Sequence, residues 1–270
     1  MSKILLSIVL SVLVLSGCSA SEDTESIIVG LECAYAPFNW TQTDETDSSV
    51  LIDEDGAGYC DGYDIQIAKA IAEEANRTLV VKKIGWDGLI PALTNGEIDM
   101  IVAGMTDTEE RRQSVAFSDP YYQSDMVLIV RNDSTYANAV SLADFNSASV
   151  IAQLNTFHDT IVDQIKNVNH LTPLNSFALL TNAVLQGEAD AMVSEYPVAL
   201  SIVNNNPDLT MIQFDEGQGF ELSFEDTTVS VATRLEDTEL IDTINAVLST
   251  LNQDTRNEMM ATAIALQPAE

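Results

Sequence analysis

The chain has 270 residues, of which 46% are hydrophobic and 20% are charged, a composition typical of a globular protein rather than a disordered one. Its 42 acidic and 11 basic residues give a formal net charge of −31 at pH 7. This charge excludes a nucleic-acid-binding protein, because the phosphates would be repelled, and it leaves no basic patch for anionic lipid. We interpret the charge as a source of solubility in a demanding environment outside the cell.

The N-terminus has the pattern of an export signal. Residues 4–15 form a mostly apolar run that is too short to span a bilayer. The letters LSGC at 15–18 match the cleavage site of a bacterial lipoprotein. We therefore predict a signal peptide over residues 1–17, followed by an acylated Cys18 and a polar tether over 18–26. The mature protein is then extracytoplasmic and held on the bacterial cell membrane by acyl chains. The alternative is an ordinary signal peptide with a chance cysteine.

Two further cysteines, Cys33 and Cys60, are expected in an oxidising compartment. They either form a disulfide or remain two small buried thiols. Their spacing matches no CxxC or Cys/His metal motif. We expect no metal and no other cofactor.

From residue 27 onward, apolar runs alternate with stretches of helical periodicity. Strands are predicted at 27–31, 79–81 and 100–103, and helices from residue 62 and over 86–93. The polar stretch 41–58 predicts an exposed loop. Strands that alternate with helices predict βαβ units on a parallel sheet.

The pattern restarts after residue 122. The second half predicts strands at 126–130, 150–152, 189–193 and 228–232, and helices at 141–145, through 161–165, at 177–186 and at 239–251. Two similar α/β lobes in one chain predict a ligand cleft between them. We assign lobe 1 to residues 27–124 plus 228–270, and lobe 2 to residues 125–227.

A candidate anion site follows the predicted strand at 100–103. Gly104 breaks the apolar pattern, and Thr106 and Thr108 can each cap the start of a helix. Arg111 falls in the first turn of that helix, where a guanidinium and free backbone N–H groups can together hold a carboxylate. The alternative is that Arg111 forms a surface ion pair.

Other polar and aromatic residues lie near the carboxyl ends of predicted strands, where ligands bind in parallel sheets. They are Glu32, Tyr35, Trp86, Gly104 and Thr106. The alternatives are that the two aromatics belong to the core and that Glu32 pairs with a lysine. We interpret His158 and His170 as surface residues.

With these residues in place, the chain resembles the extracytoplasmic solute-binding proteins of polar amino-acid ABC transporters, family 3. The resemblance covers nearly all of residues 27–250. It is carried by YAPF at 35–38, GYDIQIAKAIAEE at 62–74, WDGLIPAL at 86–93, GEIDMIVAGMTDTEERRQSVAFSDPYY at 96–122 and GEADAMVSE at 187–195. It implies the type 2 periplasmic-binding fold, an α/β architecture with two lobes. Each lobe is a mostly parallel sheet flanked by helices.

The resemblance also implies roles for single residues. Arg111 holds the α-carboxylate of an amino acid, helped by amides near Thr106 and Thr156, and Glu195 replaces the family's aspartate for the α-ammonium. Tyr35 and Trp86 sandwich the ligand side chain, and Glu32 contacts its far end. Gly104, Met105 and Phe157 complete the expected site.

Three departures from the family pattern leave the ligand's identity open. Leu154 and Asn155 replace a stretch where the family often has glycine and a small hydroxyl residue. Phe157 stands where some binders of cationic amino acids carry a polar residue, and residues 257–270 lack the aromatic ending of relatives.

The resemblance implies a binding protein rather than an enzyme. We expect a monomer that captures a free polar amino acid and delivers it to an ABC permease and its ATPase. A periplasmic dehydratase-like enzyme with Glu32 as general acid, or a ligand sensor, is the alternative on the same fold. The electron-rich faces of Tyr35 and Trp86 beside Glu32 favour a cationic ligand, arginine or lysine, over glutamine.

Overall fold

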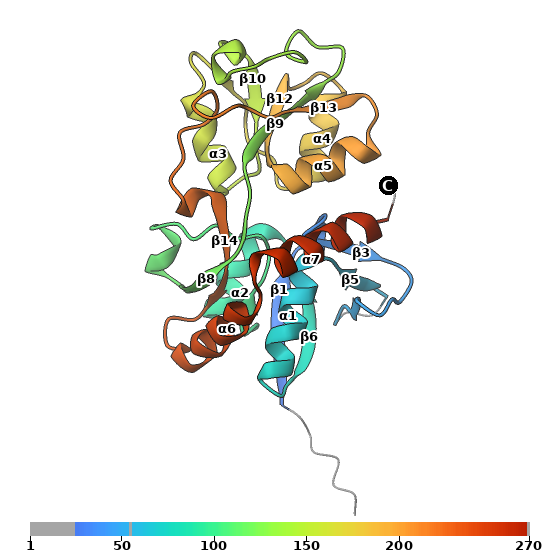
Figure 1. The fold of residues 1–270 in the computed structure, drawn as a ribbon, viewed down its shortest axis with the longest axis vertical. Helices are drawn as coiled ribbons and strands as arrows, with labels where there is room; N and C mark the ends of the chain where they lie inside the picture. The colour runs from blue at the N-terminus through green and yellow to red at the C-terminus, as the bar shows by residue number, and fades with distance from the viewer. Residues whose placement is uncertain (1–24, 54–55, 269–270) are drawn as a thin grey trace, which may run out of the picture.

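The structure is a computed structural model that describes residues 25–53 and 56–268 (Figure 1). The predicted signal peptide, Cys18 and most of the predicted tether lie outside the described residues. The chain forms two lobes, each built on its own five-stranded sheet, as the type 2 periplasmic-binding fold requires. None of the described helices is long and apolar enough to cross a membrane.

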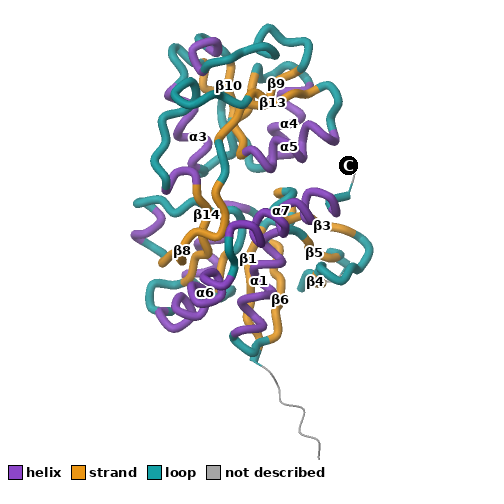
Figure 2. Tube along the Cα trace, in the orientation of Figure 1, coloured by secondary structure: helices purple, strands orange, loops and turns teal. Residues whose placement is uncertain are grey.

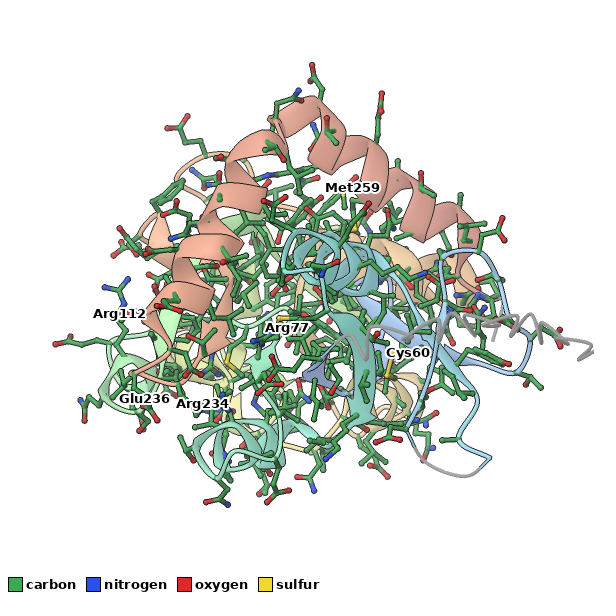
Figure 3. The ribbon with its side chains drawn as sticks, turned by 90° about the horizontal axis from the view of Figure 1, so that it is seen from below. Cys60, Arg77, Arg112, Arg234, Glu236 and Met259 are labelled. Atoms are coloured by element: carbon green, nitrogen blue, oxygen red, sulfur yellow. A yellow bond between two sulfur atoms is a disulfide. The ribbon has the colours of Figure 1, made fainter. Side chains whose placement is uncertain are left out.

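The first lobe is built on a sheet with the strand order β6-β1-β7-β14-β8. Strand β1 runs parallel to β6 and β7, as predicted, whereas β14 runs antiparallel to both β7 and β8. Helices α6 and α7 pack against α1 (Figure 3). The strands are β1 (Ser26–Leu31), β6 (Thr78–Lys83), β7 (Met100–Ile101), β8 (Ala116–Gln123) and β14 (Thr228–Thr233). The helices are α1 (Tyr63–Glu74), η1 (Trp86–Gly88), α2 (Leu89–Thr94), η2 (Arg111–Gln113), α6 (Thr238–Thr250) and α7 (Gln253–Leu266).

The second lobe is built on a sheet with the order β11-β10-β12-β9-β13. Strand β10 is parallel to β11 and β12, and β9 is antiparallel to β12 and β13. The strands are β9 (Met126–Arg131), β10 (Ser149–Ile151), β11 (Asn169–His170), β12 (Ala191–Glu195) and β13 (Leu209–Ile212). The helices are η3 (Leu142–Phe145), α3 (Phe157–Ile161), η4 (Val162–Gln164), α4 (Phe177–Leu185) and α5 (Tyr196–Asn205), with η5 (Glu225–Thr227) leading back to the first lobe.

Two chain segments cross between the lobes side by side. One joins β8 to β9, and the other enters β14 after η5 (Figure 2). The amide N–H of Ser124 donates to the carbonyl of Thr227 at 2.9 Å, and Gln123 pairs with Thr228. A third link comes from the end of α7, where the Ser201 hydroxyl of the second lobe donates to Gln267 at 2.7 Å. The paired crossing segments therefore form a two-stranded connection between the lobes.

Part of the predicted loop at 41–58 is folded instead. A small sheet forms from β2 (Ala34–Tyr35), β3 (Asn39–Gln42), β5 (Tyr59–Asp61) and β4 (Val50–Leu51). Ile52 is buried against the first lobe, which the polar composition of the stretch concealed. Cys33 and Cys60 form a disulfide, so of the two alternatives for these cysteines the paired one is present. Cys60, which is labelled in Figure 3, lies on β5 of the small sheet.

The predicted helix after Gly104 is wrong. The segment forms only the single 3-10 turn η2 that begins at Arg111. Thr108 accepts a bond from the Arg111 amide at 3.3 Å, but Thr106 forms a β-bridge with Val229 instead of a cap. Tertiary pairing of this segment with β14 therefore outweighs its local helix signals. The predicted anion site therefore lacks the helix N-terminus that the sequence led us to expect.

Candidate ligand site between the lobes

Residues of both lobes line a cleft between them. Most of the predicted ligand-binding residues meet there, and only Met105 and Glu195 of the predicted set are not on its wall. Gln153 and His158 line the cleft as well, although the sequence did not single them out as ligand-binding. The first lobe contributes Glu32, Tyr35, Trp86, Gly104, Thr106 and Arg111, and the second contributes Gln153, Thr156, Phe157 and His158.

Glu32 directly follows β1 and reaches into the cleft. The Gln153 side chain of the second lobe donates to its carboxylate at 3.3 Å and also donates to the carbonyl of Asn175 at 3.1 Å. Burial raises the pKa of Glu32 to about 7, although the bonds from Gln153 and the Trp86 backbone oppose this rise. No ion pair among the described residues involves Glu32, so the predicted alternative of a lysine partner is not present there.

Arg111 lies across the cleft with its guanidinium held by backbone carbonyls. Its Nη1 donates to the carbonyl of Thr106 at 2.7 Å, and its Nη2 donates to that of Asn155 in the second lobe at 3.1 Å. The guanidinium carbon is 5.1 Å from the centre of the Trp86 ring. Burial lowers the pKa of Arg111 to about 10, so the group stays positive at neutral pH.

The alternative prediction for Arg111 was a surface ion pair, and it is the neighbouring Arg112 that forms one. Arg112 is exposed, bonds to Asp107 at 2.6 Å and points away from the protein (Figure 3). Two adjacent arginines thus have different environments, and only Arg111 is placed to meet a ligand.

Gly104 forms a tight part of the cleft wall because Tyr35 crosses it. Its φ is 59°, and a Cβ at this position would lie 2.9 Å from Cε1 of Tyr35. Its N–H donates to the Tyr121 hydroxyl at 2.9 Å, which in turn donates to Asp64 at 2.7 Å. Burial raises the pKa of Asp64 to about 6. This buried network fixes the backbone below the site.

The side chain of Met105 does not line the cleft, and its predicted ligand contact stays a prediction. Its side chain is 1% exposed and is packed in the core. Its carbonyl accepts a bond from the Ser230 amide at 2.9 Å. Gly104 and Thr106 thus line the cleft, whereas the side chain of Met105 between them faces the interior.

Three buried polar side chains lie together beside the cleft without hydrogen bonds. They are Tyr35, His158 and Glu195. The hydroxyl of Tyr35, both ring nitrogens of His158 and both carboxylate oxygens of Glu195 have no hydrogen-bond partner among the described residues. The closest approach between the last two is 3.8 Å, from Nε2 of His158 to Oε1 of Glu195. Buried polar groups are normally hydrogen-bonded, so this cluster indicates a place for a polar ligand group.

The charges of this cluster follow from its burial. Burial and, to a smaller extent, the charge of Asp64 raise the pKa of Glu195 to about 8. Burial and, to a smaller extent, the charge of Arg111 lower the pKa of His158 to about 4. At neutral pH His158 is therefore uncharged and the Glu195 carboxyl is mostly protonated.

The prediction that His158 is a surface residue is wrong. It is 6% exposed at the start of α3 and meets the Phe177 ring edge-on at 5.9 Å. Its neighbour Thr156, the residue before α3, donates its hydroxyl to the Gln153 carbonyl at 2.7 Å. Gln153 lies two residues after the end of β10, a strand-end position comparable to the one that identified Glu32, whereas a lone histidine carries no comparable signal.

No group of three or more His, Cys, Asp or Glu side chains able to hold a metal ion occurs in the part of the chain that the structure describes. The described residues of the cleft wall include the guanidinium of Arg111, the carboxyl group of Glu32 and the aromatic rings of Tyr35, Trp86 and Phe157.

Comparison with known proteins agrees with this fold. The profile of the bacterial extracellular solute-binding proteins, family 3, matches residues 27–263. The chain belongs to this family. It is accordingly a solute-binding protein that acts outside the cytoplasm, and not an enzyme.

Individual family members are similar at moderate identity. A probable histidine-binding protein of Campylobacter jejuni is 32% identical over 75% of this chain and 73% of its own length. An arginine-binding periplasmic protein of Mannheimia haemolytica is 26% identical over 89% of this chain and 91% of its own. The crystal structure of an amino acid ABC transporter substrate-binding protein from Streptococcus pneumoniae, bound to L-arginine, aligns with a TM-score of 0.75 at 26% identity. The alignment covers 90% of this chain and 95% of that one.

Proposed function

We propose that this chain is the lipid-anchored binding component of an ABC importer that captures a free cationic amino acid, arginine or lysine. It acts as a monomer and delivers the amino acid to the membrane permease and its ATPase. The observation that carries the cationic assignment is Glu32. It is a cleft-lining carboxyl group that has no basic partner among the described residues and whose pKa burial raises to about 7. The ligands named for two similar proteins, arginine and histidine, support this choice.

The cleft is able to hold both ends of such a ligand. Arg111 has five N–H donors, of which two serve Thr106 and Asn155, so donors remain for an α-carboxylate. An α-ammonium brings three donors to the unpartnered cluster that contains Glu195. A guanidinium or ammonium at the far end of the ligand would give Glu32 the positively charged partner that it lacks. This group would lie beside the face of Trp86.

The ligand assignment is tested by a thermal-shift screen of the wild-type protein against the common amino acids, because a ligand that binds the native state raises the melting temperature. We expect L-arginine or L-lysine to give the largest rise. A rise with L-glutamine and none with arginine, lysine or histidine would contradict the cationic assignment.

The role of Glu32 is tested by Glu32→Gln with Glu74→Gln as its matched control. Glu74 is exposed at the end of α1, so its substitution changes the net charge equally without touching the cleft. Glu32→Gln should weaken the affinity for the cationic ligand at least about tenfold, since it breaks a buried charge pair. Equal affinities of the two variants would remove Glu32 from the site.

The lipid anchor is a separate part of the proposal and rests on the LSGC pattern that ends at Cys18. Cys18→Ser should abolish acylation and release the protein from membranes, which fractionation followed by immunoblotting measures. Retention of the variant on membranes in a strain that lacks the permease would contradict the anchor.

The lobe boundaries are likewise our assignment. Lobe 1 comprises residues 27–124 plus 228–270, and lobe 2 comprises residues 125–227. The strand membership of the two sheets and the pairing of the crossing segments support these limits.

A further inference from the structure

Three hydrogen bonds between the lobes converge on Asn155 at the rim of the cleft. Its carbonyl accepts from the Trp86 indole N–H at 3.0 Å and from Nη2 of Arg111 at 3.1 Å. Its side-chain amide donates to the carboxylate of Asp87 at 2.9 Å. All three partners belong to the first lobe, whereas Asn155 follows β10 in the second. These bonds must therefore break when the lobes separate.

The backbone of Asn155 explains how one residue makes all three contacts. Its φ is 57°, in the left-handed region that asparagine tolerates better than most residues. The residue is exposed at the end of a short segment between Gln153 and the start of α3. This conformation lets the carbonyl face Trp86 and Arg111 while the side chain reaches Asp87.

Two of the three partners also line the ligand cleft. Trp86 packs against the guanidinium of Arg111 at 5.1 Å, and the same Asn155 carbonyl accepts a bond from each. The contact thus fixes the relative position of the indole and the guanidinium. In an open protein both groups would lose this restraint.

We propose that Asn155 is an interlobe latch, a positioning residue that holds the closed arrangement of the lobes and orders Trp86 and Arg111 for the ligand. The proposal rests on the proposed function of capture by closure between two lobes. The latch would lengthen the time that the ligand stays bound, although Asn155 itself does not contact the ligand. Closure is favoured by the latch whether or not a ligand is bound, since none of the three bonds involves a ligand.

The test uses variants that alter the side-chain bond and keep the backbone conformation accessible. Asn155→Gly deletes only the bond to Asp87, because glycine adopts positive φ readily. Asn167→Gly is the matched control: Asn167 is exposed, has a φ of 54° and bonds only to Asn146 within the second lobe.

A donor and acceptor exchange gives a sharper test. Asn155→Asp places two carboxylates against each other, whereas the double variant Asp87→Asn/Asn155→Asp exchanges donor and acceptor and restores the bond. If the wild-type rates return in the double variant, the bond between residues 87 and 155 is the cause of the effect. A second substitution would not reverse an effect that came from misfolding.

Two measurements are made on each variant. Stopped-flow fluorescence gives the dissociation rate of L-arginine, and NMR gives the solvent exchange of the Trp86 indole N–H in the ligand-free protein. The Trp40 indole, which bonds to Gln42 within the first lobe at 2.9 Å, is the internal reference.

We expect Asn155→Gly to speed dissociation by roughly fivefold, the factor for one net hydrogen bond, and to speed exchange at Trp86. Asn155→Asp should speed both dissociation and Trp86 exchange more strongly than Asn155→Gly does. In the double variant both rates should return to within about twofold of the wild type. Asn167→Gly should leave both rates unchanged, and exchange at the Trp40 indole should be the same in every variant. If L-arginine does not bind, the cationic assignment fails, and the exchange of Trp86 alone still decides the latch. Equal Trp86 exchange in the wild type and Asn155→Asp, or no recovery in the double variant, would overturn it.

Discussion

The contribution of Arg111 to ligand binding can be worked out from its environment. Its guanidinium already donates to two backbone carbonyls, at 2.7 Å and 3.1 Å, and lies 5.1 Å from the Trp86 ring centre. In the proposed function it also holds the ligand's α-carboxylate through two parallel bonds. Arg111→Lys keeps the positive charge but replaces this planar fork by a single ammonium.

The magnitude follows from the bonds that a lysine would lose. One ammonium with three donors is not able to serve Thr106, Asn155 and both carboxylate oxygens at once. Loss of at least one hydrogen bond to a charged group costs about 1.5–3 kcal/mol, and the stacking on Trp86 adds about 0.5–1 kcal/mol. We therefore expect Arg111→Lys to weaken affinity by about 2–4 kcal/mol, which corresponds to roughly 30- to 900-fold.

Isothermal titration calorimetry with the amino acid that most raises the melting temperature measures this loss. Arg112→Lys is the matched control, since the neighbouring arginine is exposed and pairs with Asp107 away from the cleft. The control should bind as the wild type does. An affinity of Arg111→Lys within about twofold of the control would show that Arg111 does not hold the carboxylate, and the reasoning above would fail.

Three further outcomes follow from groups near and away from the cleft. Burial raises the pKa of Glu195 to about 8, so its carboxyl becomes able to pair with an α-ammonium as the pH rises. By calorimetry, affinity should rise at least about tenfold more from about pH 6 to about pH 8 in the wild type than in Glu195→Gln; parallel pH profiles would exclude this role. The disulfide joins cysteines 27 positions apart, and replacing Cys33 and Cys60 by alanine should lower the free energy of unfolding by about 3–4 kcal/mol. An unchanged urea midpoint would contradict this. Burial alone would lower the pKa of His170, but bonds to two aspartates raise it above its ordinary value. The resulting stability is complete below about pH 6.5 and is lost as the pH rises through the raised pKa. His170→Gln should therefore lower the melting temperature at about pH 5.5 and have little effect at about pH 9, and an equal loss at both would refute the assignment.

The sequence by itself determined the alternation of strands and helices and much of the cleft wall. The apolar residues of α1 recur at helical spacing, and Ile67, Ala68, Ile71 and Ala72 are buried as that spacing requires. Glu32 and Trp86 were identifiable because they follow strands whose carboxyl ends meet at one edge of a sheet. Such placements depend on local periodicity and on a general rule of parallel sheets, so they can be predicted from the sequence alone.

The ends of elements were less well predicted where tertiary contacts compete with local signals. The segment after Gly104 carries two potential capping threonines, yet Thr106 pairs with Val229 and only one 3-10 turn remains, beginning at Arg111. The polar stretch at 41–58 contains strands because it pairs with β5 in the small sheet. Long-range backbone pairing decided both, and no local pattern encodes it.

Only the tertiary structure decided which polar groups are buried and which residues the lobes bring together. His158 and Glu195 lie on separate elements of the second lobe, and packing alone removes both from water and shifts their pKa values in opposite directions. Asn155 contacts Asp87 across 68 positions of sequence. Burial and contact across a cleft depend on how two lobes close on each other, and that arrangement is a property of the packed chain rather than of any one segment.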